Sequence, residues 1–377
     1  MMACEPIDPG QVRPVPMLET GRGGPMAHAG GFALILVLAV LVALTVLATT
    51  VALIAQRLRD DHLQRQREWQ AELAMADTRA SVLYLLASQR VTFGGLTIDD
   101  QVRLTADEQA EARAVGEAPL TMMPIGNEIR LDGRAYLGLG GVDFALQDDH
   151  GLLAFNWSPP LALQARMQQW QVPMSWRRLS DLLLDYQDGD DLHRRDSAER
   201  EHYLEAGLAP PTGRALVSPQ QLRAVMGWRD VLAGLDDAVL ENSFTAVRSA
   251  MINVNTAPAH VLESIPGIDA EAAARIVDGR RTQPYTLLRQ IGQQAPALDL
   301  EQVDWLTLAP GSSGTLRMWS REGGPMRVLH WTLTPIDDGG APWREDYEYS
   351  LSQDGIDPGR GTRVAETPIL AESLPAP

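Results

Sequence analysis

The sequence of 377 residues contains no lysine, since all 32 of its basic residues are arginine. This absence excludes Schiff-base chemistry, a lysine general base and the nucleotide-binding loop that requires a lysine. The single cysteine, Cys4, lies close to the N-terminus. The rest of the chain can therefore form neither a disulfide framework nor a zinc site built on cysteine, and it has no thiol nucleophile.

The chain also lacks the short motifs of common hydrolases, zinc proteases and dinucleotide-binding enzymes. Its formal net charge of -17 argues against a surface for nucleic acid, because phosphate backbones bind clustered positive charge. We therefore expect this protein not to be an enzyme, and we regard nucleic-acid binding as a poor first hypothesis.

One uncharged segment, residues 32–55, reads FALILVLAVLVALTVLATTVALIA. Its 24 residues are enough to cross a bilayer at about 1.5 Å per residue. A cleavable secretory signal has a shorter apolar core, of about 7 to 15 residues. The segment therefore predicts a retained, single transmembrane helix. Neither proline nor glycine occurs between Ala55 and Gly94, which predicts that this helix continues into water to about residue 92.

Beyond the membrane segment, apolar and small residues recur at steps of three and four, which places them on one face of the helix. These residues are Trp69, Leu73, Ala76, Ala80, Leu83 and Ala87. We expect this face to pack on the globular part of the protein. A contact with a helix of a partner is the alternative.

The globular part contains two groups of short, strand-like segments. Residues 122–156 alternate between apolar and polar side chains around the turn pairs Asp132-Gly133 and Gly140-Gly141, and residues 315–335 and 343–351 form the second group. The intervening stretch is mostly helical in pattern. The sequence thus predicts an α+β fold, in which a long N-terminal helix packs on a small antiparallel sheet that a large helical insertion interrupts.

The expected boundaries follow from this pattern. The first half of the sheet-bearing part covers residues 93–159, the inserted domain residues 160–310, and the second half residues 311–352. Residues 353–377 are rich in proline, glycine and polar residues, which is typical of a disordered tail.

Within the insertion, residues 253–281 read as two short helices joined by the turn Pro266-Gly267-Ile268, a helix-hairpin-helix-like pattern. In DNA-binding versions of this pattern, backbone N–H groups and nearby cations hold a phosphate. Here Asp269 and Glu271 follow the turn directly, so negative charge lies where a phosphate would approach. We therefore favour a structural or partner-binding role for this segment.

An acidic segment between Asp185 and Tyr203 is the one plausible ion site. Hard oxygen ligands at this density suit calcium, although their spacing is not that of an EF-hand loop. The better ligand candidates are Asp188, Asp190, Asp191 and Glu199. The alternative is a solvated acidic face that the arginines at 194, 195 and 200 neutralise.

Several stretches resemble one family, the minor pseudopilin K of type II secretion systems. Gly31-Phe32, followed at once by the apolar run, is similar to the site that a prepilin peptidase cuts, which makes residues 1–31 a leader and Phe32 the methylated N-terminus. Most pilin-like subunits carry glutamate at the fifth mature position, where this chain has Leu36, and the K subunit typically lacks that glutamate.

Three further stretches carry the same resemblance. Residues 148–156 look like the family's strand with an Asp-x-x-Gly motif that ends in Asn, and residues 185–203 are similar to its acidic segment. The segment INVNTAPAHVLESIPGI, residues 252–268, is the closest match. K pseudopilins carry calcium in the inserted helical domain, so the resemblance also implies a calcium site.

The resemblance implies a minor pseudopilin at the tip of a periplasmic pseudopilus, which nucleates and caps the fibre for protein export. Its partners would be the I and J minor pseudopilins, the major pseudopilin, the inner-membrane assembly platform and the prepilin peptidase. The chain would be a single-pass protein of a Gram-negative inner membrane with a periplasmic C-terminal domain, although four arginines just after the membrane segment favour the opposite orientation.

Three alternatives remain at this point. They are a membrane-tethered helix-hairpin-helix DNA receptor of the kind used in competence, a minor pilin of a type IV pilus, and a tethered periplasmic enzyme with an unfamiliar site.

Overall fold

The computed structural model describes residues 30–98, 120–335, 340–352 and 370. It contains two compact units, Met1–Gln66 and Arg67–Pro377, which we describe separately. The expected leader, apart from its last two residues, and the expected disordered tail, apart from Leu370, lie outside the described residues.

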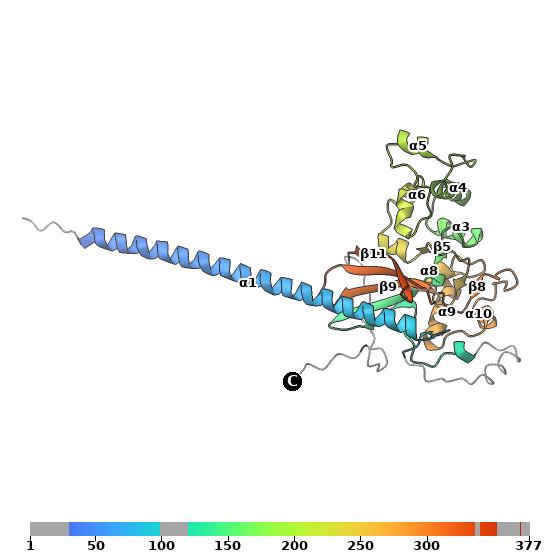
Figure 1. Ribbon diagram of the computed structural model, residues 1–377, viewed down its shortest axis with the longest axis horizontal. Helices are drawn as coiled ribbons and strands as arrows, with labels where there is room; N and C mark the ends of the chain where they lie inside the picture. Colours follow the sequence, from blue (N-terminus) through green and yellow to red (C-terminus); the bar gives the residue numbers. More distant parts are fainter. Residues whose placement is uncertain (1–29, 99–119, 336–339, 353–369, 371–377) are drawn as a thin grey trace, which may run out of the picture. The chain divides into compact units, whose positions relative to one another are not determined.

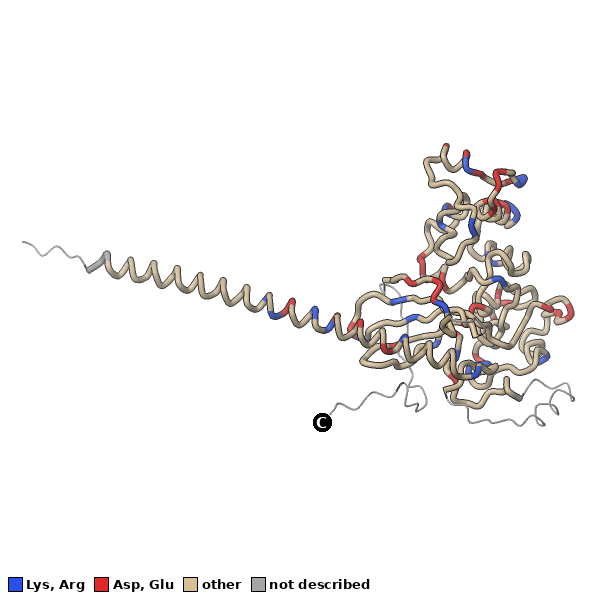
Figure 2. The backbone as a smooth tube through the Cα atoms, viewed as in Figure 1, with Lys and Arg blue, Asp and Glu red and all other residues tan. Residues whose placement is uncertain are grey.

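Helix α1 (Gly30–Ser88) begins in the first unit, and its membrane segment carries no charge (Figure 2). It is long and apolar enough to cross a membrane by length and composition, and none of its most apolar window is buried inside the protein. The hydroxyls of Thr45, Thr49 and Thr50 each donate to a carbonyl one turn earlier, at 2.7–2.9 Å. These bonds satisfy the polar groups of the segment without a partner, as a lipid environment requires.

The second unit is built around a five-stranded antiparallel sheet with the order β11-β10-β9-β4-β3 (Figure 1). Its strands are β3 (Asp132–Leu137), β4 (Val142–Asp148), β9 (Ser313–Ser320), β10 (Met326–Leu333) and β11 (Trp343–Leu351). Strands β4 and β9 are neighbours in the sheet, although the helical insertion separates them in sequence. The expected fold class is confirmed.

The part of α1 that belongs to the second unit covers one face of this sheet. Leu85 and Leu86 of the helix are buried in one cluster with Phe144, Leu316 and Trp331 of the sheet. Full burial of one such leucine stabilises the fold by about 1.5–3 kcal/mol relative to exposure. The contact between helix and sheet is therefore a principal source of the stability of this unit.

The helix also lies close to the turn between β3 and β4, at Gly138. A Cβ atom at this glycine would lie 2.7 Å from Cγ2 of Thr78. The Thr78 hydroxyl in turn accepts a hydrogen bond from the backbone N–H of Leu139 at 3.0 Å. Arg79, the next residue of the helix, forms ion pairs with Glu345 and Glu348 of β11, at the other edge of the sheet.

The predicted packing of the helix stripe is wrong for most of its residues. Trp69 and Leu73 are 67% and 51% exposed, Ala76 and Ala80 are exposed too, and Leu83 alone is fully buried. The sheet is instead covered by the opposite side of the helix, which carries Ala74, Met75, Thr78, Val82, Leu85 and Leu86.

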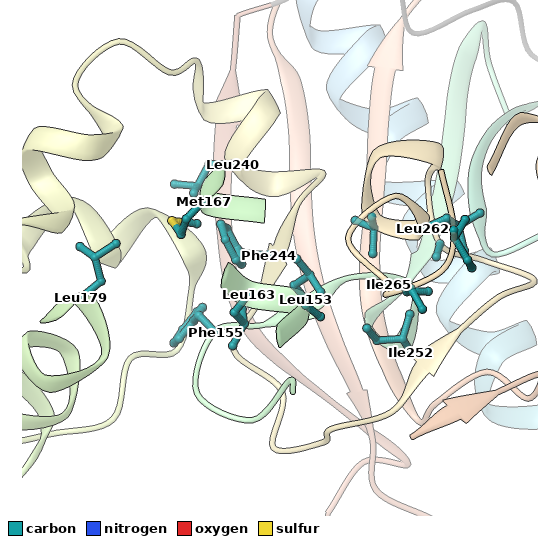
Figure 3. Close-up of a cluster of buried hydrophobic side chains, with 14 of the residues drawn as sticks. Leu153, Phe155, Leu163, Met167, Leu179, Leu240, Phe244, Ile252, Leu262 and Ile265 are labelled. Carbon is teal, nitrogen blue, oxygen red and sulfur yellow. The ribbon is translucent and has the colours of Figure 1, made fainter. Parts of the chain in front are cut away.

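The insertion contains helices α3 to α10, which surround the largest buried apolar cluster of the described residues (Figure 3). The helices are α3 (Pro160–Gln169), α4 (Trp176–Gln187), α5 (Arg200–Glu205), α6 (Trp228–Leu232), α7 (Asp237–Glu241), α8 (Ala259–Leu262), α9 (Ala270–Thr282) and α10 (Leu288–Gln294). Trp228 is fully buried among them, and its indole N–H donates to the carbonyl of Leu179 at 2.9 Å.

Short strand pairs and single turns complete the second unit. Strands β5 (Leu153–Ala154) and β6 (Phe244–Thr245) form one parallel pair, β7 (Ile252–Asn253) and β8 (Leu306–Thr307) form another, and β1 (Val91–Thr92) and β2 (Gly95–Leu96) form an antiparallel hairpin. The 3₁₀ turns are η1 (Leu120–Met122), η2 (Asp149–Gly151) and η3 (Pro219–Ala224).

Candidate functional site

The residues expected to be processed lie at the start of α1. Gly31 and Phe32 belong to its first turn, and Leu36 follows one turn later with 55% of its surface exposed. The structure thus places an apolar side chain at the fifth position of the expected mature chain. The cleavage itself stays a prediction.

Helix α1 has a second apolar face that is exposed in the part of the chain that the structure describes. We call it the outer stripe, and it consists of Trp69, Leu73, Ala76, Ala80 and Tyr84. Tyr84, which the sequence analysis missed, is 55% exposed and extends the stripe by one turn. Successive residues turn by about 100°, so the outer stripe lies opposite the face that packs on the sheet. Its small central alanines leave room for close approach of another helix.

The acidic segment forms a carboxylate cluster at the end of α4. Asp185, Asp188 and Glu199 each offer one oxygen, and these three oxygens lie within 4.8 Å of one another. Asp185 and Asp188 are three residues apart, at the last turn and the C-cap of α4, while Glu199 is the N-cap of α5. Figure 2 shows acidic and basic residues gathered around these two helices.

The structure thus brings together two of the four expected ligands, Asp188 and Glu199. Asp190 and Asp191 are exposed on the loop between the helices and are not part of the group within 4.8 Å. Asp185 takes their place, and it is fully buried. Its spacing to Asp188 at the end of an amphipathic helix is the sequence signal that points to it. Which residues bind an ion stays a prediction.

Two oxygens of the carboxylate cluster have no partner. Oδ1 of Asp188 and Oε1 of Glu199 are buried and accept no hydrogen bond. Burial raises the pKa of Glu199, and the nearby carboxylates of Asp188 and Asp191 raise it further. Burial and the charge of Asp190 likewise raise the pKa of Asp188. Unpaired buried carboxylate oxygens are costly, and a hard cation such as calcium is the group that they suit.

One arginine already contacts this cluster. Nη1 of Arg194 lies 2.6 Å from Oδ2 of Asp188 and also contacts Oδ1 of Asp185. The backbone N–H of Arg194 and the hydroxyl of Ser197 donate to the second oxygen of Asp185. The three carboxylates therefore carry a negative charge that one guanidinium neutralises only in part.

The Asp148-Asp149 pair, which belongs to the family-like strand motif, lies where the insertion leaves and rejoins the sheet. Asp148 is fully buried and accepts four hydrogen bonds at 2.8–3.1 Å. The donors are the backbone N–H groups of His150 and Gly311, the amide of Asn253 and the hydroxyl of Thr256. One carboxylate thereby holds both connections and the insertion together.

Asp149 makes the matching contacts to the sheet. It accepts hydrogen bonds from the hydroxyls of Thr245 and Ser313 and pairs with Nε2 of His330 at 2.9 Å. The other ring nitrogen of His330 lies 2.8 Å from Oδ2 of Asp346. Burial by itself lowers the pKa of His330, but the two carboxylates outweigh it and raise the pKa to about 10. His330 is therefore a buried cation between two anions.

The polar side chains in and around residues 252–268, the closest family-like stretch, form hydrogen bonds that stabilise the fold. Asn255 donates to the carbonyls of Tyr285 and Leu308 at 2.8 and 3.1 Å and accepts from the N–H of Tyr285. Arg280 on α9 donates to the carbonyls of Val254 and Ala257 at 2.7 and 2.6 Å. These groups fix the loop between β7 and α8 and hold no reactive arrangement.

The turn Pro266-Gly267-Ile268 joins α8 to α9. Gly267 has a φ of 89°, and a Cβ atom there would lie 2.5 Å from the carbonyl oxygen of Ala297, so the turn requires glycine. The side chain of Asp269 accepts a hydrogen bond from the N–H of Ala272 at 2.8 Å and caps α9. A carboxylate thus occupies the helix terminus at which a phosphate would bind. The helix-hairpin-helix interpretation stays a prediction.

A groove of about 780 Å³ runs between the insertion and the sheet. Its insertion side carries the exposed apolar residues Trp157, Leu184 and Val217, and its sheet side carries His330 and Asp346. Asp188 and Arg194 lie at the same groove, so the carboxylate cluster opens onto it.

Comparison with known proteins identifies one segment of the chain. Residues 252–309, which run from β7 through β8, match the sequence model of a family described as "Type II secretion system (T2SS), protein K". No curated protein matches the chain. A chain in the crystal structure of the GspK-GspI-GspJ complex from the enterotoxigenic Escherichia coli type 2 secretion system is similar, with a TM-score of 0.47 and 15% identity over 78% of this chain and 99% of that one. The resemblance to type II secretion protein K that the sequence predicted is confirmed over residues 252–309.

Proposed function

We propose that this protein is a minor pseudopilin of a type II secretion system that helps to nucleate and cap the pseudopilus at its tip. The observation that carries the proposal is the match of residues 252–309 to the family model of protein K. The apolar helix at the start of α1 fits an anchor in the inner membrane, with the second unit in the periplasm. The described residues contain no arrangement that would favour a catalytic role instead.

Two features support a position at the tip. A carboxylate within the bilayer is costly unless a neighbouring subunit pairs with it. A subunit with no neighbour above it would therefore gain nothing from a glutamate at position 36. The helical insertion adds bulk that a position within the shaft of the fibre would have to accommodate. Leu36 and the insertion therefore both favour a subunit at the end of the fibre.

The proposed partners are the I and J minor pseudopilins, with which protein K forms the GspK-GspI-GspJ complex of enterotoxigenic Escherichia coli. The outer stripe supports such a contact, because it presents apolar and small residues on a helix face that is exposed among the described residues. The major pseudopilin, the assembly platform and the prepilin peptidase complete the proposed set.

The N-terminal residue of the membrane-extracted protein tests this function. In cells that contain the prepilin peptidase, mass spectrometry should find Phe32 as a methylated N-terminus, and in cells without the enzyme the leader should remain. The variants Gly31→Leu and Gly30→Leu form a matched pair, of which only the first should block cleavage. A mature chain that has lost the apolar segment, or an N-terminus that does not depend on the peptidase, would contradict the proposal.

We also propose that the carboxylate cluster binds calcium. Asp188 and Glu199 would hold the ion through the two buried oxygens that have no hydrogen-bond partner, and Asp185 would contribute a third carboxylate. Calcium would supply a structural link between α4 and α5. Isothermal titration calorimetry with calcium tests the site. Glu199→Gln should abolish calcium binding, whereas the control Glu201→Gln, at an exposed position on α5, should still bind calcium.

A further inference from the structure

Arg194 contacts two of the three carboxylates in the cluster. Its Nη1 contacts one oxygen of Asp185 and lies 2.6 Å from Oδ2 of Asp188. Both oxygens of Asp185 are therefore engaged, and Asp188 keeps one free oxygen. The fully buried carboxylate of Asp185 can give an oxygen to an ion only when the guanidinium leaves it.

The charges of the carboxylate cluster also indicate that Arg194 and a cation compete for it. Asp185, Asp188 and Glu199 carry three negative charges, and Arg194 neutralises one of them. Oε1 of Glu199, a residue that is 4% exposed, has no partner and shows that the cluster is not satisfied by the arginine alone. A divalent ion would meet this remaining charge, but it would be repelled by a guanidinium that stays beside it.

We propose that Arg194 is an internal counter-ion that competes with a divalent cation for Asp185 and Asp188, and that cation binding releases its guanidinium toward the groove. The inference rests on the calcium site proposed above. The groove offers a path, because Arg194 lines it and 39% of its side chain is exposed. The arginine thus keeps α4 and the following loop together without an ion, and the ion takes over this role when it binds.

The experiment compares the full-length protein with Arg194→Gln and Arg195→Gln. Arg195 is the adjacent arginine, is exposed and changes the net charge by the same amount. Titration with calcium chloride should show at least about tenfold tighter binding for Arg194→Gln than for the wild type, because a positive charge next to the ion has gone. Arg195→Gln should bind within about twofold of the wild type, since charges that are exposed to solvent are screened.

Thermal unfolding supplies a second readout. Without calcium, Arg194→Gln should unfold at a lower temperature than the wild type, and with calcium it should recover more of its stability. A purely structural ion pair would lower the stability without tightening calcium binding. Equal or weaker calcium affinity in Arg194→Gln would overturn the inference while leaving the calcium site intact. If the wild type and Arg194→Gln both fail to bind calcium, the site proposal fails first and the inference with it.

The wild-type protein gives a test that does not depend on the folding of a variant. Phenylglyoxal modifies accessible arginines, and mass spectrometry separates the products at Arg194 and Arg195. Calcium should raise the modification rate at Arg194 several-fold and leave Arg195 unchanged as the internal reference. A rate at Arg194 that calcium lowers or does not change would overturn the release of the guanidinium.

Discussion

At the scale of single residues, the acids of this chain have three different environments. Asp190 and Asp191 are exposed, Asp149 is buried against a histidine, and Glu199 is buried without a partner for one oxygen. Burial by itself raises the pKa of Asp149, but the charge and hydrogen bonds of His330 lower it below its ordinary value. The same type of side chain is thus solvated at one position, paired within the fold at a second and left with an unpaired buried oxygen at a third.

His330→Gln should remove a pH-dependent contribution to stability. The pKa of His330 is about 10 in the folded protein and near its ordinary 6.5 in the unfolded chain. The stabilisation is therefore fully present below pH 6.5 and is lost as the pH rises from 6.5 to 10. Its upper bound is about 5 kcal/mol, from about 1.4 kcal/mol for each pH unit.

Chemical denaturation at several pH values measures this effect. The wild type should lose unfolding free energy between pH 6.5 and 10, and His330→Gln should show a much flatter dependence. His62→Gln, at an exposed histidine of α1, is the control and should follow the wild type. If the wild-type stability does not change across this range, His330 is not a buried cation.

At the scale of elements, α1 shows what periodicity can and cannot predict. Apolar residues at steps of three and four correctly predicted a helix, but the helix carries apolar residues on two opposite sides. Trp69 and Leu73 lie on one side and Val82 and Leu85 on the other. Periodicity gives the same signal for both sides, so only the position of the sheet decides which one is buried.

The strands were easier to predict than the membership of the carboxylate cluster. Alternation and the Gly140-Gly141 turn identify β3 and β4 from local sequence alone, because a hairpin brings together residues that are close in the chain. The carboxylate cluster joins Asp185 to Glu199 across a loop whose path local sequence does not determine. The density of acids therefore identified the segment, and the fold was needed to exclude Asp190 and Asp191 from the cluster.

Leu73→Arg should weaken assembly with partner subunits without destabilising the fold. Leu73 lies on the outer stripe and is 51% exposed, so its substitution should change the unfolding free energy by less than about 0.5 kcal/mol. It should nevertheless weaken the contact with a partner helix, because it places a charge on an apolar face. Co-purification with the I and J pseudopilins and thermal unfolding measure the two effects.

Leu85→Ala on the other side of α1 is the matched control. Leu85 is fully buried against the sheet, so the variant should lose about 2–5 kcal/mol of unfolding free energy. The prediction would be contradicted if Leu73→Arg co-purified with its partners as well as the wild type does.

At the scale of the second unit, three buried apolar clusters are linked by polar contacts between the sheet and the insertion, and the third cluster lies on the sheet with Ala238 of the insertion packed against it. The core between α1 and the sheet and the core of the insertion are separate clusters. Asp148 connects them, because it binds Asn253 and Thr256 of the insertion and the N–H of Gly311 where the chain returns to β9. Asp148 therefore contributes to the coupling between sheet and insertion, together with the contacts of Asp149 with Thr245 and of Tyr349 with Glu241.

Asp148→Asn should weaken that coupling. The substituted amide can accept hydrogen bonds with one atom only, and its NH₂ group would face donors, which leaves buried groups unpaired at a cost of about 1–3 kcal/mol each. Because the apolar clusters remain intact, differential scanning calorimetry should show one transition for the second unit of the wild type and two for the variant. Asp278→Asn, at an exposed acid on α9, should keep one transition. A single transition in Asp148→Asn at an unchanged temperature would show that other contacts, and not the Asp148 carboxylate, couple the insertion to the sheet.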